Sequence, residues 1–275
     1  MWNAPAPTQQ RPQDRRIKLD GATEKLQVYA GMPHAAPQTA LITGAGRRIG
    51  RAIALDLALH GWRVGIHYRR SRAEAEALAG HIRSNGGTAA ALLGDLANTD
   101  DVRSLVTRCA EALGPPTCLV NNASEFFLDT ITSVTSPGWD THLEINLKAP
   151  VFLAQALFLN LPEGTEGNVI NIIDQRVWRP TPDFFSYTIS KAGLWTATQT
   201  LAQAMAPRVR VNAIGPGPVL KSVHQTEKDF AAETAATLLK RGPTLEEIAA
   251  AVRFILATPS MTGQMIALDG GQHLA

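Results

Sequence analysis

From about residue 38 to the C-terminus, short apolar runs alternate with longer segments of helical periodicity. Seven runs have the length of buried strands: 39–43, 63–68, 88–93, 117–124, 168–173, 209–214 and 264–269. Helices are predicted between them, over 51–59, 72–85, 100–113, 139–161, a segment that ends near Pro207, and a segment opened by Thr244. Strands that alternate with helices predict an α/β fold, a single Rossmann-type doubly wound parallel sheet of about seven strands flanked by helices.

Two segments depart from this alternation. Residues 1–37 contain five of the 17 prolines and little apolar periodicity. They are interpreted as a flexible N-terminal extension to a domain formed by residues 38–275, or as the product of a misplaced start site. Residues 219–242 are polar and irregular with some helical pattern, and we interpret them as a mobile substrate lid.

The composition is that of an ordinary globular protein, with 45% apolar and 18% charged residues. A net charge of +2 gives no reason to expect binding to nucleic acid. No apolar run reaches the ~20 residues of a membrane span, and no signal pattern opens the chain, so a cytoplasmic protein is expected. Cys109 and Cys118 lack the spacing of metal ligands and are interpreted as reduced core cysteines, so no metal site is predicted.

Tyr187 and Lys191 stand four residues apart in a predicted helix, which puts them on one face. An ammonium beside a phenol favours phenolate, so we expect Lys191 to lower the pKa of Tyr187 and make it a proton donor. Asp174 directly follows the 168–173 strand, and open α/β sheets bind ligands at the carboxyl ends of their strands. Tyr-x-x-x-Lys alone also fits an ordinary surface helix, so the choice between a catalytic pair and a surface pair depends on the rest of the chain.

A glycine-rich turn, residues 44–50, joins the first strand to the first helix. This context is typical of a loop whose N–H groups hold a pyrophosphate, although an ordinary turn has the same composition. Arg69, Arg70 and Ser71 follow the second strand, where NAD-binding folds usually carry an acidic residue. Arginines suit phosphate oxygens, so we predict NADPH rather than NADH, with Arg47 approaching from the loop; a solvated basic turn is the alternative.

Other strand ends and one helix carry further candidates. Asp95 would either cap a turn or contact an adenine edge. Phe126 follows the 117–124 strand, which suggests a flat ligand or, alternatively, packing of the loop. Asn146 lies inside a predicted helix without a propensity reason, so a hydrogen-bonding role is proposed. The turn at 215–218 would pass over the site.

Taken together, residues 38–275 resemble the short-chain dehydrogenase/reductase family. The resemblance is carried in order and spacing by the 43–50 loop, Asn121-Asn122-Ala123, Asn146, Tyr187-x-x-x-Lys191 and Gly215-Pro216-Gly217. Two positions depart from the common pattern, because Arg48 replaces a glycine and Asp174 replaces the catalytic serine. Both replacements, together with segments 67–71 and 122–126, resemble the pteridine reductase branch, which includes dihydromonapterin reductases. The ending, residues 268–274, most resembles the bacterial dihydromonapterin reductases.

The resemblance implies NADPH-dependent reduction of a pterin of the dihydromonapterin, dihydrobiopterin or dihydrofolate type to its tetrahydro form, by hydride transfer to a C=N bond, in a homotetramer. The implied catalytic residues are Asp174, Tyr187, Lys191 and Asn146. The implied cofactor-binding residues are Gly44, Arg47, Arg48, Ile49, Gly50, His67, Tyr68, Arg69, Arg70, Ser71, Asp95, Leu96, Asn122, Ala123, Ser124, Tyr187, Lys191, Pro216 and Gly217. The implied substrate-binding residues are Arg48, Ser124, Phe126, Asp174, Tyr187 and Pro216.

The residue types fit this chemistry. A carboxyl group suits proton delivery to a ring nitrogen, so Asp174 and Tyr187 are interpreted as a relay, with Lys191 on the nicotinamide ribose. Phe126 would stack on the pterin and Arg48 would donate to it. The first alternative is an NADPH-dependent carbonyl reductase of a 3-oxoacyl thioester or other ketone, which the missing serine disfavours. The second is a non-catalytic NADPH-binding sensor, which the intact Tyr187–Lys191 pair disfavours.

Overall fold

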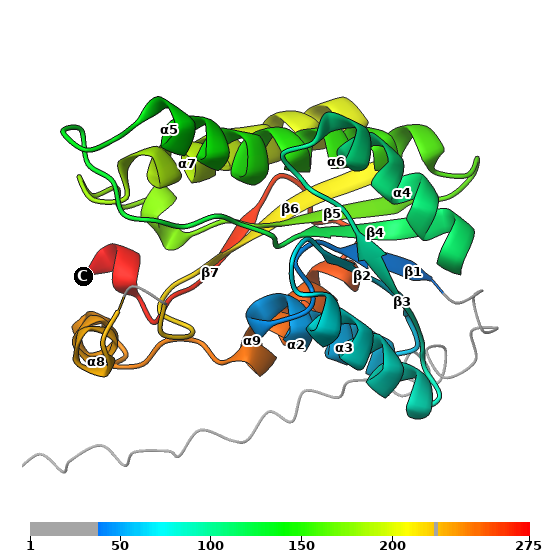
Figure 1. Cartoon of the computed structure of the whole chain (residues 1–275), viewed down its shortest axis with the longest axis horizontal. Helices are drawn as coiled ribbons and strands as arrows, with labels where there is room; N and C mark the ends of the chain where they lie inside the picture. Colours follow the sequence, from blue (N-terminus) through cyan, green and yellow to red (C-terminus); the bar gives the residue numbers. More distant parts are fainter. Residues whose placement is uncertain (1–37, 223–224) are drawn as a thin grey trace, which may run out of the picture. The chain divides into compact units, whose positions relative to one another are not determined.

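The computed structural model describes residues 38–222 and 225–275 (Figure 1). The N-terminal extension predicted for residues 1–37 lies outside the described residues. No helix in the described part of the chain is long and apolar enough to cross a membrane.

Seven parallel strands form one sheet in the order β3-β2-β1-β4-β5-β6-β7. Their bounds are β1 Thr39–Ile42, β2 Arg63–Tyr68, β3 Thr88–Leu93, β4 Pro116–Asn121, β5 Gly167–Ile172, β6 Val209–Pro216 and β7 Met265–Leu268. Successive strands are added to one side of β1 up to β3 and to its other side from β4 onward. Doubly wound sheets form a crevice for ligands at such a switch, here between β1 and β4. The predicted doubly wound parallel sheet is confirmed.

Helices cover both faces of this sheet (Figure 1). On one face lie α2 Arg48–Leu59, α3 Arg72–Ser84 and α9 Leu245–Leu256. On the other lie α4 Thr99–Leu113, α6 Ala149–Asn160 and α7 Phe185–Met205. The shorter elements are α5 Ser136–Leu143, the π-helical turn η1 Glu144–Lys148, the 3₁₀ turns η2 Gln175–Val177 and η3 Gln272–Leu274, and α8 Glu227–Ala236.

Two apolar layers hold the helices to the sheet. Ile53 of α2 and Val252 of α9 are fully buried in one layer, and Leu105 of α4 and Leu153 of α6 are fully buried in the other. Burial of one such side chain contributes about 1.5–3 kcal/mol relative to leaving it exposed. Both free cysteines are buried in these layers, as the sequence predicted.

Two boundaries differ from the prediction, each for a local reason. The helix expected over 139–161 is interrupted by the π turn at Glu144–Lys148, and such turns are frequent at functional sites. The fourth strand ends at Asn121, because the next two N–H groups donate to the hydroxyl of Thr43 instead of continuing the ladder. The helical pattern predicted within segment 219–242 corresponds to α8, which begins behind a capping box made by Thr226.

Candidate active site

Two cavities lie at the carboxyl ends of the strands, with volumes of about 460 and 350 Å³. The first is lined by the turn after β1, the end of β2 and the loop after β4. The second is lined by the segments after β4, β5 and β6, together with α8 and η3. Arg48, Ile49, Asn122 and Ser124 line both cavities, so a ligand in one would lie next to a ligand in the other.

The glycine-rich turn forms the floor of the first cavity. Gly44 has a φ of +62°, and a Cβ there would lie 3.0 Å from the Ala123 Cα. A Cβ on Gly50 would lie 2.6 Å from the Gly44 carbonyl oxygen, so this glycine permits close packing of α2. Within the described residues no side chain caps the first turn of α2, which leaves its N–H groups for an anion. This open cradle fits the phosphates of a dinucleotide.

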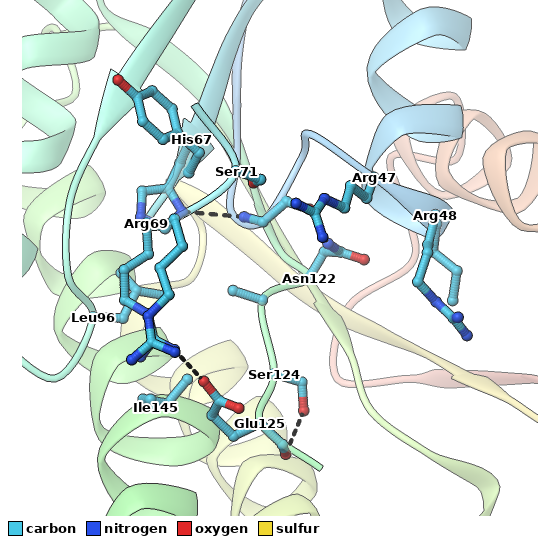
Figure 2. Close-up of a pocket in the computed structure, with 15 residues that line it drawn as sticks. Arg47, Arg48, His67, Arg69, Ser71, Leu96, Asn122, Ser124, Glu125 and Ile145 are labelled. Carbon is cyan, nitrogen blue, oxygen red and sulfur yellow. Dashed lines mark hydrogen bonds and ion pairs between the residues drawn. The ribbon is translucent and has the colours of Figure 1, made fainter. Parts of the chain in front are cut away.

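Arginines surround the cavity (Figure 2), and two of the three arginines predicted to bind phosphate form ion pairs with carboxylates. Arg69 donates to Glu125 at 2.5 Å and lies 3.7 Å from Asp95. Arg47 forms an ion pair with Glu74, whereas Arg70 is exposed. A ligand phosphate would therefore compete with these carboxylates for Arg47 and Arg69.

The sequence is compatible with two roles for Asp95, a turn cap and a contact with adenine. Its side chain accepts from the Ala97 N–H at 3.0 Å, and it lines neither cavity. Asp95 therefore caps a turn in this structure, in addition to its long ion pair with Arg69, and the contact with adenine stays a prediction.

His67 lies beneath the glycine-rich turn and is 2% exposed. Its Nδ1 accepts from the Gly44 N–H at 3.1 Å, so its Nε2 carries the proton and donates to the Gly94 carbonyl at 3.1 Å. Burial lowers the pKa of His67 to about 4, against an ordinary value of 6.5. A neutral imidazole thus joins the turn after β1 to the end of β3.

The second cavity contains the predicted catalytic group (Asp174, Tyr187 and Lys191). The Tyr187 hydroxyl donates to Oδ2 of Asp174 at 2.9 Å, and Oδ1 of Asp174 accepts from the Arg176 N–H at 2.8 Å. The Lys191 ammonium donates to the Ile172 carbonyl at 2.9 Å and lies 5.7 Å from the centroid of the Tyr187 ring. The end of β5 and one face of α7 bring these three side chains together, as the sequence predicted.

The expectation that Lys191 lowers the pKa of Tyr187 is wrong. Burial, and then the carboxylate of Asp174, hold the pKa of Tyr187 well above its ordinary value of 10.0. Burial also raises the pKa of Asp174 and lowers that of Lys191 to about 8. The cause is that this cluster is taken out of water, with Tyr187 and Lys191 only 6% and 2% exposed. In this state Tyr187 is a firmly protonated donor to Asp174.

Two aromatic rings stack beside this group. Phe126 and Phe184 lie with centroids 4.4 Å apart and planes 8° apart, and Tyr187 meets Phe126 edge-on at 4.7 Å. Phe184 adopts a left-handed φ of 57° directly before α7, and the Arg176 guanidinium lies 5.0 Å from its ring centroid. Phe126 lines the cavity as predicted, whereas Phe184 was missed. A pair of phenylalanines before a helix was the only signal for it.

Arg48 occupies the boundary between the cavities. Its φ is 50°, in the region that glycine prefers, which accounts for the glycine usual at this position. Its guanidinium donates to the Leu220 and Lys221 carbonyls at 3.0 and 2.9 Å. The donor predicted for the pterin therefore holds the main chain after β6 in this structure.

Asn146 is fully buried in the π turn and lines neither cavity. Its Oδ1 accepts from the Glu125 N–H at 2.9 Å and from the Ser124 hydroxyl at 3.1 Å. Its Nδ2 donates to the Glu125 carbonyl at 3.0 Å and to the Ser190 hydroxyl at 3.1 Å. Asn146 thus has the hydrogen-bonding role proposed for it, because it ties the loop after β4 to α7 and positions both; its catalytic role stays a prediction.

The remaining predicted residues divide between the two cavities, except that Gly50, like Asp95 and Asn146, lines neither. The predicted residues in the first cavity are Gly44, Arg47, Arg48, Ile49, His67, Tyr68, Arg69, Arg70, Ser71, Leu96, Asn122, Ala123 and Ser124. Those in the second cavity are Arg48, Ile49, Asn122, Ser124, Phe126, Asp174, Tyr187, Lys191, Pro216 and Gly217. Lining residues that sequence reasoning missed include Glu125, Arg176, Phe184, Gln225, Glu233 and Gln272.

Known proteins share this sequence pattern. A family model described as short chain dehydrogenase matches residues 38–232. The 3-oxoacyl-[acyl-carrier-protein] reductase of Synechocystis sp. is 31% identical over 238 residues, which cover 85% of this chain and 96% of that protein. Curated relatives therefore include reductases of ketone substrates.

Solved structures share the fold as well. FolM Alternative dihydrofolate reductase 1 from Brucella suis, solved in complex with NADP, is 51% identical with a TM-score of 0.85, over 86% of this chain and 96% of that one. A blue fluorescent protein from a metagenomic library, in complex with NADPH, is 30% identical with a TM-score of 0.80, over 86% and 97%. At these identities the likeness extends to sequence as well as fold.

Proposed function

Because this chain belongs to the short chain dehydrogenase family, we propose that it reduces a dihydropterin to the tetrahydro form by hydride transfer to a C=N bond. It is an NADP-dependent short-chain oxidoreductase. One observation carries the choice of substrate: at the end of β5 the Tyr187 hydroxyl donates to a carboxyl group, that of Asp174. The 51% identity to a protein named as an alternative dihydrofolate reductase supports the same choice.

The first cavity suits the cofactor. The uncapped first turn of α2 and the turn at Gly44 would hold the pyrophosphate, and Arg69, Arg70 and Ser71 would hold the 2′-phosphate. Lys191 would hold the nicotinamide ribose from the second cavity. When bound, NADPH supplies the hydride.

Proton delivery is the task of the chain's own residues. Hydride addition to a C=N carbon leaves negative charge on nitrogen, which a positioned acid must neutralise. Burial raises the pKa of Asp174, and the 2.9 Å bond from the Tyr187 hydroxyl gives the two groups a path along which a proton can move. The Lys191 ammonium stabilises negative charge on this pair. Asp174 and Tyr187 therefore serve as the relay, and Lys191 as its charge partner.

The pterin ring has an aromatic neighbour in the second cavity. Phe126 lines the cavity beside Tyr187, so a flat ring bound there can stack on it. Ser124, Arg48 and Pro216 complete the proposed substrate contacts. The homotetramer, the cytoplasmic location, the flexible N-terminal extension and the substrate lid stay predictions.

A ketone is the second candidate substrate. The 31% identity to a 3-oxoacyl-[acyl-carrier-protein] reductase favours it, since cofactor and tyrosine chemistry would be shared. Against it stands Asp174, because a carboxylate beside a developing alkoxide repels it, whereas a hydroxyl would donate to it.

A panel of substrates distinguishes a dihydropterin reductase from a ketone reductase. NADPH oxidation would be followed with dihydrobiopterin, dihydrofolate, a 3-oxoacyl thioester and simple ketones. Turnover of a dihydropterin at least about 100-fold more efficient in kcat/KM than that of any ketone is expected, since general acid catalysis contributes about 10²–10⁴-fold. Efficient ketone turnover without pterin turnover would replace the proposal by the carbonyl reductase alternative.

A further inference from the structure

One wall of the second cavity is formed by α8 and the turn η3, and it carries an acidic group. Among the described lining residues, Glu233 and Asp174 are the acids. Asp174 belongs to the proton relay, whereas Glu233 contacts none of the catalytic group in the described hydrogen bonds. Its presence in the cavity is therefore left unexplained by the chemistry proposed above.

Two glutamines hold this carboxylate in place. Gln272 of η3 donates to Oε1 of Glu233 at 3.1 Å, and Gln225 donates to Oε2 at 2.6 Å. Gln225 is itself fixed, since its amide oxygen accepts from the Ser222 N–H at 3.0 Å. A carboxylate oxygen accepts two hydrogen bonds, so each oxygen of Glu233 retains acceptor capacity toward a ligand. All three side chains line the cavity.

The cations that line the cavity are engaged with groups other than Glu233. Arg48 donates to the main chain of residues 220–221, and Lys191 donates to the Ile172 carbonyl. Arg176 donates to Thr181 and lies over Phe184. Among the residues that the structure describes, no cation forms an ion pair with Glu233, so it presents a negative charge to a ligand that reaches this wall.

We propose that Glu233, held by Gln225 and Gln272, selects the substituent of the substrate. It accepts hydrogen bonds from a neutral, hydroxylated side chain and repels an anionic one. Hydroxyl donation to a carboxylate is charge-assisted and strong, whereas two carboxylates in a partly buried cavity repel each other. Resting on the proposed function, this makes the substrate a dihydropterin with a short polyhydroxylated substituent, in preference to dihydrofolate, whose glutamate tail is anionic.

One nearby cation offers a competing account. Arg179 is exposed and donates to the main-chain carbonyl of Gln272 at 3.2 Å, so it could bind a glutamate tail at the cavity rim. Arg179→Gln tests this account, because selective loss of dihydrofolate turnover in that variant would assign the tail to Arg179. Glu246→Gln is the matched control for Glu233, since Glu246 is exposed in the first turn of α9.

The experiment measures kcat/KM for dihydrobiopterin and dihydrofolate in the full-length wild type, Glu233→Gln, Glu246→Gln and Arg179→Gln, with the KM for NADPH as a check on folding. Wild type should prefer dihydrobiopterin, and Glu233→Gln should reduce that preference about tenfold or more, which is the scale of one hydrogen bond to a charged group. Glu246→Gln and Arg179→Gln should leave the preference unchanged.

Two failures are distinguishable. If both dihydropterins are reduced but the ratio of their kcat/KM values is the same in wild type and Glu233→Gln, or if wild type prefers dihydrofolate, the selecting role of Glu233 is overturned and the proposed function stands. If wild type reduces ketones and neither dihydropterin, the proposed function fails and the selecting role fails with it.

Discussion

Two consecutive residues of α7 each donate a hydroxyl to an aspartate, with different consequences. Tyr187 donates to Asp174 at 2.9 Å in a cluster that includes Lys191 and lines the second cavity. Ser186 donates to Asp129, and its hydroxyl lies 2.6 Å from the Nδ1 of His142. Asp129, Ser186 and His142, here termed the closed cluster, are 4%, 0% and 0% exposed and line none of the cavities described.

The closed cluster has the residue types of a hydrolytic triad without its geometry. In such a triad histidine lies between serine and aspartate, whereas here Ser186 lies between the other two. Asp129 also accepts from the Ser186 N–H at 3.1 Å, and its carbonyl accepts from the Phe185 N–H at 3.1 Å. The closed cluster therefore fixes the start of α7 to the loop after β4. Access to a cavity, and not residue type, separates a reactive cluster from a structural one.

Removal of the Tyr187 hydroxyl should have the largest effect on activity. Tyr187→Phe should lower kcat by about 10²–10⁴-fold, because the relay loses its proton donor. The NADPH dissociation constant, measured by fluorescence titration, should change little, since the first cavity is untouched. Full turnover in this variant would remove Tyr187 from the relay and erase the distinction between the two clusters.

Asp174→Ser should change which substrate is reduced. A serine keeps a hydrogen-bonding partner for Tyr187 but is too weak an acid to pass a proton to a ring nitrogen, so dihydropterin kcat/KM should fall by about 10²-fold. Ketone turnover should rise, because a hydroxyl donates to a developing alkoxide. Asp183→Ser, at an exposed position before α7, is the control and should change neither. Unaltered pterin turnover in Asp174→Ser would contradict the relay.

The pH dependence of kcat/KM should depend on the catalytic group and not on the closed cluster. The pKa of Lys191 is lowered to about 8, so its ammonium, which supports negative charge on the relay, is present below that pH and lost above it. We expect kcat/KM to fall about tenfold per pH unit above pH ~8, with Lys191→Arg free of that limb because arginine stays charged. The raised pKa of Tyr187 keeps this hydroxyl protonated over the same range. A flat profile up to pH ~10 would contradict this assignment.

The sequence alone was sufficient to predict those groups of residues whose proximity follows from local geometry. An apolar run that ends in Asp174 and a four-residue spacing from Tyr187 to Lys191 bring three side chains together without knowledge of the rest of the fold. Alternation of strands and helices likewise predicted the sheet. These patterns could not predict how deeply the three side chains are buried, because burial depends on segments that are distant in the sequence. The direction of the Tyr187 pKa shift was wrong for that reason.

The missed residues depend on contacts between distant segments. Phe184 stacks on Phe126 with its backbone in the left-handed conformation directly before α7, and no local sequence pattern predicts that conformation. Asn146 was noticed as unusual, but its partners come from the loop after β4 and from α7. Glu233 lies in a segment interpreted as polar and irregular, and only the fold brings it to Gln272. Sequence thus identified the reacting groups better than the groups that surround them.

Substitution in the closed cluster is expected to have the smallest effect on activity and to lower the stability of the protein instead. Ser186→Ala leaves the buried Asp129 carboxylate and His142 Nδ1 without their shared partner, which should lower the free energy of unfolding by about 1–3 kcal/mol. Thermal denaturation should show a Tm lower by several degrees, whereas Ser84→Ala, at an exposed position in α3, should leave the Tm unchanged. The kcat of Ser186→Ala should stay within about threefold of wild type at a temperature where both are folded, because this hydroxyl faces no ligand. A loss of kcat as large as that of Tyr187→Phe, with the Tm unchanged, would show that the closed cluster takes part in proton transfer and that burial alone does not make it structural.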